Sequence, residues 1–226
     1  MKHHTTGGME LDQPYVRCLM VETGQEGNIL RLLGARRIGR GLCPLRTRIR
    51  KIRGTWRQDM IRLLPGYVFV FTEREEPIRR FYQLEHMLRI LRYDREPEGY
   101  LRGADLEFAL LMRELDGKLG LLEAVEEDGF IRVTDPLLEA LRGRVLSVQR
   151  GKRQAEVQIE LMGEPVVLHM NYRLTGRNGK PLDPAEETVI EMLEDESDEW
   201  ITAWTPDFSD DLIEKLDLET EGEDTP

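Results

Sequence analysis

The sequence predicts an α+β fold in which a small mixed sheet packed with helices is followed by a small β-barrel. Residues 15 to 22 and 67 to 71 are apolar on both alternating faces, which is typical of central strands covered on both sides. Residues 129 to 175 instead contain short stretches in which apolar and polar side chains alternate. The 226 residues, 40% of them hydrophobic, suffice for two small cores.

A helix is expected after the first strand. Thr23, Gly24, Gln25 and Glu26 have the sequence of a capping box, in which the threonine and the glutamate satisfy amides at the start of a helix. Apolar residues follow at helical spacing, and Gly34 is expected to end the helix.

A β-hairpin is expected next. Between residues 45 and 50, apolar or small side chains alternate with Arg46, Arg48 and Arg50. Arg53 and Gly54 form the expected turn, and residues 55 to 60 the returning strand.

The order strand, helix, strand, helix continues to residue 116. After the strand at 67 to 71, Pro77 begins a short helix, residues 87 to 93 read as a strand, and Phe108 and Met112 lie on the apolar stripe of a last helix. These elements predict a first domain over residues 14 to 116, an α/β sandwich.

A polar link over residues 117 to 127 separates this domain from an all-β segment. Strands are expected at 130 to 133, 144 to 148, 155 to 161 and 166 to 170, which predicts an SH3-like barrel over residues 128 to 176. The remaining residues, 177 to 226, form an acidic extension, expected to be partly helical or disordered.

The net charge of −11 conceals a strong asymmetry. Residues 182 to 226 carry 18 acidic side chains against one lysine, whereas residues 1 to 181 carry 31 basic side chains against 25 acidic ones. The body of the protein is therefore basic and can bind phosphate.

The basic charge is concentrated between Arg31 and Arg62, where eleven basic residues accompany one acidic residue, Asp59. Alternate residues of a strand lie on one face about 7 Å apart, so a row of arginines there can follow a nucleic-acid backbone. Trp56 is expected to help by stacking on a base. A solvated strand face remains the alternative. The candidate nucleic-acid-binding residues are Arg36, Arg37, Arg40, Arg46, Arg48, Arg50, Lys51, Arg53, Trp56 and Arg57.

Catalytic chemistry is not expected. The sequence has no nucleophile motif, no phosphate-binding glycine loop and no His/Cys set with metal-ligand spacing, so we expect neither a metal nor a cofactor. Its two cysteines suit a reducing compartment, and its apolar stretches are too short to cross a bilayer. A cytoplasmic protein that does not act on membranes is expected.

Two motifs resemble the NusG family of transcription elongation factors. Residues 63 to 70, LLPGYVFV, resemble the signature FPGYVFV of the family's amino-terminal (NGN) domain. The second resemblance is to its KOW domain, and it runs in order through residues 128 to 129, 133 to 137, 141 to 145, 152 to 153 and 161 to 163. The arginine-rich hairpin and the dibasic turn are more similar to specialised paralogs, the LoaP antiterminators. Leu63 and Leu64 replace the aromatic pair of the family signature.

The resemblance implies a factor that binds the clamp helices of RNA polymerase and favours processive elongation. LoaP-like relatives are also recruited by a hairpin in the nascent RNA and act as antiterminators. The implied polymerase-binding residues are Tyr15, Leu64, Pro65, Gly66 and Tyr67. The implied KOW surface for ribosomal or termination factors is Leu161, Met162 and Gly163.

Three alternatives stay open. The first is that the chain is a ribosome- or RNA-associated KOW protein that does not act on polymerase. The second is that Tyr67 only fills the core. The third concerns the acidic extension, which either competes with nucleic acid for the basic hairpin or is a solubilising tail or a separate partner-binding segment.

Overall fold

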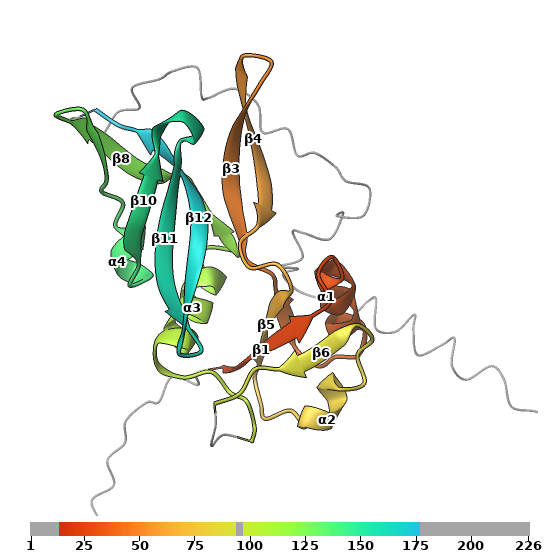
Figure 1. Ribbon diagram of the computed structural model, residues 1–226. Helices are drawn as coiled ribbons and strands as arrows, with labels where there is room; N and C mark the ends of the chain where they lie inside the picture. The colour runs from red at the N-terminus through yellow and green to blue at the C-terminus, as the bar shows by residue number, and fades with distance from the viewer. Residues whose placement is uncertain (1–13, 94–96, 177–226) are drawn as a thin grey trace, which may run out of the picture.

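A computed structural model describes residues 14 to 93 and 97 to 176. The first part is built on a four-stranded sheet of order β2-β5-β1-β6, in which β5 is antiparallel to both β1 and β2, and β6 is antiparallel to β1 (Figure 1). Its elements are β1 Tyr15–Val21, α1 Glu26–Ala35, β2 Arg40–Leu42, β5 Tyr67–Thr72, α2 Ile78–Phe81, β6 Met87–Ile90 and α3 Gly103–Glu114.

The two central strands are buried on both faces, as the sequence predicts. Along β1, Cys18 packs into one core cluster and Leu19 into the other, and Phe69 and Val68 of β5 divide in the same way. Helices α1 and α2 cover one face, and α3 covers the other, where the Phe108 and Phe69 rings lie 5.7 Å apart.

The predicted hairpin is confirmed as β3 Leu45–Ile52 and β4 Thr55–Arg62, paired in register over their full length. Arg53 and Gly54, at φ 49° and 87°, form its two-residue turn, where both residues have the positive φ that matches the twist of the strands. The short strand β7 Lys118–Leu119 adds parallel to the other edge of β3.

The second part is a barrel-like five-stranded sheet of order β10-β11-β12-β8-β9. The strands are antiparallel except that β12 and β8 are parallel. The elements are β8 Leu122–Glu127, β9 Phe130–Val133, α4 Leu137–Ala140, β10 Arg144–Gln149, the 3-10 turn η1 Arg150–Lys152, β11 Gln154–Leu161 and β12 Glu164–Leu174.

The two parts share one core. Figure 1 shows α3 between the two sheets, and the cluster that contains Phe108 and Met112 of α3 also contains Ile159, Leu161 and Leu168 of the second sheet. At the other end, β12 lies beside β3 of the hairpin. The second part therefore contacts the first at two places, α3 and the hairpin.

Several details differ from the sequence-based expectations. The capping box at Thr23 is wrong: Gln25 is the N-cap without a side-chain bond, and Glu26 accepts from the amide of Gly24 instead. The strand expected at 87 to 93 ends at Ile90. The stretch expected as a link contains β7 and β8, because its apolar residues Leu119 and Leu122 are buried.

The acidic extension, residues 177 to 226, lies outside the described residues. Within the described ranges, no helix combines the length and the hydropathy needed to cross a membrane.

Candidate functional site

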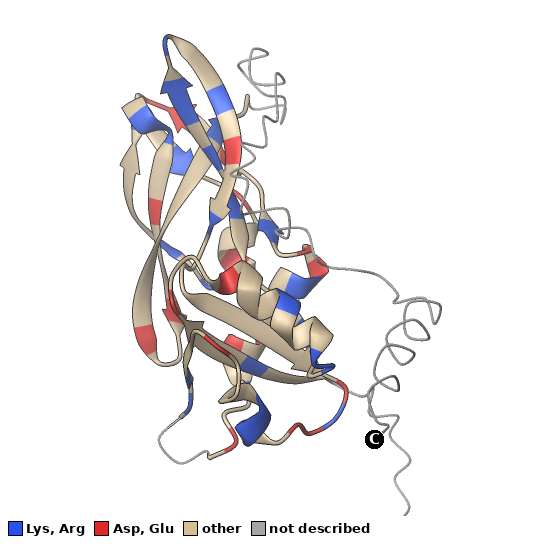
Figure 2. Cartoon of the chain, turned by 90° about the vertical axis from the view of Figure 1, so that its right-hand side faces the viewer, with Lys and Arg blue, Asp and Glu red and all other residues tan. Residues whose placement is uncertain are grey.

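The arginines of the hairpin share one face, as expected. Because the strands pair in register, Arg46, Arg48 and Arg50 of β3 lie opposite Ile61, Asp59 and Arg57 of β4. The hairpin projects beyond the first sheet, and Figure 2 shows Lys and Arg along it. This gives a narrow basic face on which cations repeat about every 7 Å.

Asp59 organises this face. Arg48 donates to both of its carboxylate oxygens, at 2.8 and 2.5 Å, and Arg50 approaches one of them at 3.2 Å. The hydrogen bonds from Arg48 lower the pKa of Asp59, which is 6% exposed, and raise the pKa of Arg48. The carboxylate thus orients two guanidinium groups and neutralises part of their charge.

Trp56 lies on the opposite face from these three arginines. Its partner in the register is Lys51, whose ammonium lies 6.0 Å from the indole centroid. The guanidinium of Arg153, which follows η1 in the second part, lies 4.8 Å from the same ring. Trp56 does not share the face of Arg46, Arg48 and Arg50, because its position differs by an odd number from those of Arg57, Asp59 and Ile61, the residues opposite them. Its expected stacking on a base stays a prediction.

Asn171 of β12 joins the hairpin to the second part. Its side-chain oxygen accepts from Arg46 at 3.3 Å, and its amide nitrogen donates to the carbonyl oxygens of Ile49, Lys152 and Arg153 at 3.3, 3.2 and 3.0 Å. Burial lowers the pKa of Arg46 beside it. No sequence pattern indicates the contact with the hairpin, because Arg46 and Ile49 are more than a hundred residues from Asn171.

The other predicted cations lie at two places. Lys51, Arg53 and Arg57 are exposed near the hairpin tip. Arg36, Arg37 and Arg40 lie after α1, and Arg36 donates to the carbonyl oxygen of Gln83 at 2.9 Å. A cavity of 480 Å³ opens there, lined among others by Pro14, Arg37, Arg40, Phe71, Arg74 and Arg113.

The implied polymerase-binding turn is largely part of the core. Leu64 is 5% exposed, Tyr67 is half-buried against the core shared by both parts, and only Pro65 is exposed. Tyr15 is 36% exposed, with its ring 5.2 Å from that of Tyr100. In this arrangement Leu64 offers no apolar surface to a partner.

Glu26 fixes the same turn from the side of α1. It is fully buried and accepts from the amides of Gly24 and Gly66, at 2.8 and 2.7 Å, and from Arg62 at 3.1 Å. Gly66 itself has a φ of 83°, and a Cβ there would lie 3.2 Å from the carbonyl oxygen of Val21. The sequence pattern predicts for Glu26 only a role in capping the helix that follows.

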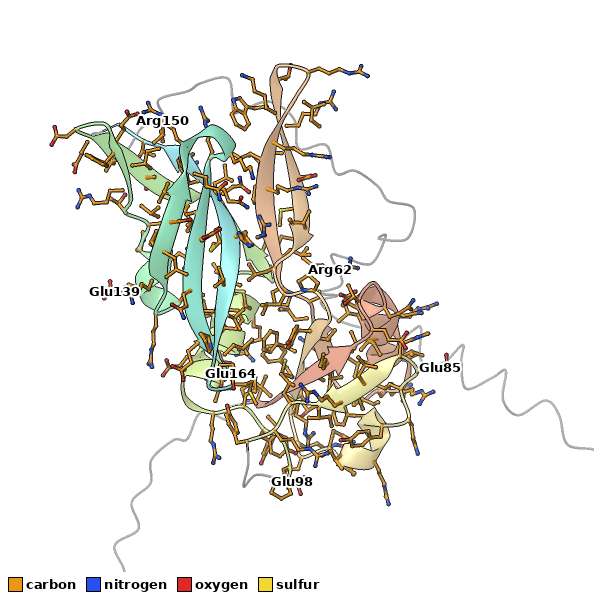
Figure 3. All side chains as sticks on the ribbon, viewed as in Figure 1. Arg62, Glu85, Glu98, Glu139, Arg150 and Glu164 are labelled. Atoms are coloured by element: carbon orange, nitrogen blue, oxygen red, sulfur yellow. The ribbon has the colours of Figure 1, made fainter. Side chains whose placement is uncertain are left out.

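The implied KOW surface is turned inward. Leu161 is buried, Met162 packs on the shared core, and Gly163 is exposed. The amide of Met162 donates to Asp105 of α3 at 2.6 Å. Figure 3 shows Glu164, next to this turn, and Arg150 at opposite ends of the second sheet. With the bonds of Asn171 to Arg46 and Ile49, the sheet is held to the first part near both ends.

No protein-family model matches the chain, and no curated protein sequence matches it. Among solved structures, the chain is similar to NusG from Thermotoga maritima, in a structure described as showing domain interaction. The TM-score is 0.40 and the identity 15%, and the similarity covers 70% of this chain and 94% of that chain.

Proposed function

We propose that this protein is a non-enzymatic transcription elongation factor that acts as an antiterminator. In this role it binds RNA polymerase through the turn at Leu64 to Tyr67 and nascent RNA through the basic hairpin. The observation that carries the proposal is the placement of these two surfaces. Strand β4 of the basic hairpin ends at Arg62, and the chain passes directly into the turn whose sequence resembles the NGN signature.

The hairpin suits RNA because its cations are arranged in a row on rigid strands. Arginine donates two parallel hydrogen bonds to a phosphate, and Asp59 already orients Arg48 and Arg50, so less conformational freedom is lost on binding. Contacts of this kind position an RNA, and its unpaired bases supply the sequence preference.

Binding to polymerase through Leu64 and Tyr67 requires a rearrangement. Leu64 belongs to the core that also contains Leu161, and Tyr67 and Met162 pack against this core. An apolar partner surface for a polymerase helix therefore becomes available when the second part moves away from α3. Pro65, which is exposed, is the part of the turn that an approaching partner meets first.

Capture of polymerase by the full-length protein tests this proposal. Wild-type protein and the control Tyr82→Ala, which truncates a tyrosine 50% exposed at the end of α2, should retain core polymerase. Tyr67→Ala should lose about tenfold or more in affinity, as is usual for an aromatic at the centre of an interface. Retention of ribosomes in place of polymerase by the wild type would support the alternative of a ribosome-associated protein.

A further inference from the structure

Two independent contacts join the hairpin to the η1 turn. Asn171, 3% exposed, holds the carbonyl oxygens of Ile49 on the hairpin and of Lys152 in η1 through one amide nitrogen. Trp56 is contacted by Lys51 of its own hairpin and by Arg153 from the second part. The backbone of η1 is thereby fixed beside β3, close to Lys51.

Unpaired cations lie on both sides of this junction. Throughout the two described ranges, no carboxylate pairs with Lys51 or Arg53 on the hairpin, or with Lys152 in η1, and all three side chains are exposed. By contrast, Arg48 and Arg50 share Asp59, and Arg150 pairs with Glu126 at 2.9 Å. The cations with no competing carboxylate are thus contributed by both parts of the protein.

We propose that the hairpin and η1 form one composite RNA-binding surface, so that an RNA backbone bridges the two parts and holds them together. This inference rests on the proposed function, in which the hairpin binds RNA, and adds that the docked second part supplies some of the phosphate contacts. By linkage, RNA that binds only the joined surface stabilises the contact between η1 and the hairpin. The turn at Met162, at the other end of the sheet, is held against α3 by a separate hydrogen bond to Asp105.

An RNA backbone suits the junction better than an acidic protein segment does. A phosphate accepts from any of the clustered cations without requiring a fixed side-chain partner, so successive phosphates of one strand can contact Lys51, Arg53 and Lys152 in turn. Trp56 is flanked by Lys51 and Arg153, so its role is to hold the junction rather than to stack on a base.

Salt-dependent RNA binding by the full-length chain tests the inference. A labelled RNA hairpin with a single-stranded loop would be titrated by fluorescence anisotropy at several salt concentrations. Lys152→Gln should reduce the slope of log affinity against log salt by about 0.7 to 0.9, the value for one phosphate contact. The matched control Arg144→Gln removes the same charge from an exposed site on β10 and should leave the slope unchanged.

Asn171→Ala gives the sharper result because it changes no charge. It should lower the RNA affinity and the salt slope by releasing η1, and the double variant with Lys152→Gln should lose no more than Asn171→Ala alone. A melting curve of Asn171→Ala verifies that this variant folds. If it does not fold, the salt slope of Lys152→Gln alone tests whether η1 contributes to RNA binding.

The outcomes separate this inference from the proposed function. If Lys152→Gln and Asn171→Ala bind like wild type while Arg53→Gln is weakened, the hairpin binds RNA alone and the composite surface is rejected. If wild type does not bind RNA, or Arg53→Gln changes nothing, RNA binding by the hairpin itself is rejected. Tighter binding to duplex DNA than to RNA overturns the assignment of RNA as the partner.

Discussion

The backbone amide of Met162 donates to Asp105 Oδ1 at 2.6 Å, and the hydroxyl of Tyr93 donates to Asp105 Oδ2 at 2.5 Å. Burial, together with this hydrogen bond, raises the pKa of Tyr93 to about 12. The carboxylate is 7% exposed and lies in the first turn of α3, where a negative charge is favourable. One side chain thus holds the turn of the second sheet against the first part.

Asp105→Ala should weaken this docking. It leaves the Met162 amide and the Tyr93 hydroxyl without their acceptor, which costs about 1 to 3 kcal/mol. Hydrogen exchange should become faster in residues 161 to 163 while the centre of β5 stays protected. Asp105→Asn keeps one acceptor oxygen and should be milder, and Glu114→Gln, at an exposed position near the end of α3, serves as the control. Unchanged exchange in Asp105→Ala would show that the core contacts alone fix the turn.

Glu26→Ala should strongly destabilise the first part. The substitution removes the acceptor of the buried Gly66 amide and of the Gly24 amide, and it removes a partner of Arg62. The expected loss in the free energy of unfolding is about 3 kcal/mol. Denaturant unfolding measures it, with Glu22→Ala as the control on an exposed carboxylate. A loss as small as that of the control would mean that water replaces the carboxylate.

Asp59 should make stability depend on pH in acid. Its pKa is lowered in the folded protein, so its contribution is present above its ordinary pKa of about 4 and is lost as the pH falls through the lower folded value. Asp59→Asn should be less stable than wild type at pH 7 and should approach it below pH 4. Denaturant unfolding at several pH values measures the difference in stability between Asp59→Asn and wild type, with Glu139→Gln as the control. A difference that stays the same at every pH would show that Asp59 does not cause the pH dependence.

The same substitution should strengthen RNA binding at pH 7. Asp59→Asn removes the negative charge between Arg48 and Arg50, and about 1 kcal/mol of attraction to a phosphate at that face corresponds to roughly fivefold in affinity. Anisotropy titration with the RNA hairpin measures this change. Weaker binding would indicate that the orientation of Arg48 by the carboxylate matters more than the charge.

The strands whose burial sets a regular pattern of apolar and polar residues were predictable from the sequence. The apolar runs of β1 and β5 and the alternation along β3 identified these strands, because burial on one or both faces sets the residue pattern directly. The strand face on which Trp56 lies is also predictable from the sequence. A two-residue turn at Arg53 and Gly54 fixes the register that pairs Trp56 with Lys51.

Contacts between distant residues were not predictable in this way. Glu26 fits a capping box in sequence, yet its carboxylate is bound by an amide 40 residues away. Asn171 and Asp105 likewise act across the two parts. The apolar Leu161 and Met162 at a turn were the one local sign of docking, because a turn that faces water rarely carries such side chains.

A purified transcription assay would test whether this protein acts on transcribing RNA polymerase. A template with an intrinsic terminator, with and without the native leader, would be transcribed with and without the full-length protein. We expect more readthrough of the terminator when the protein is present, most of all with the leader RNA. Equal readthrough with and without the protein on both templates would contradict it.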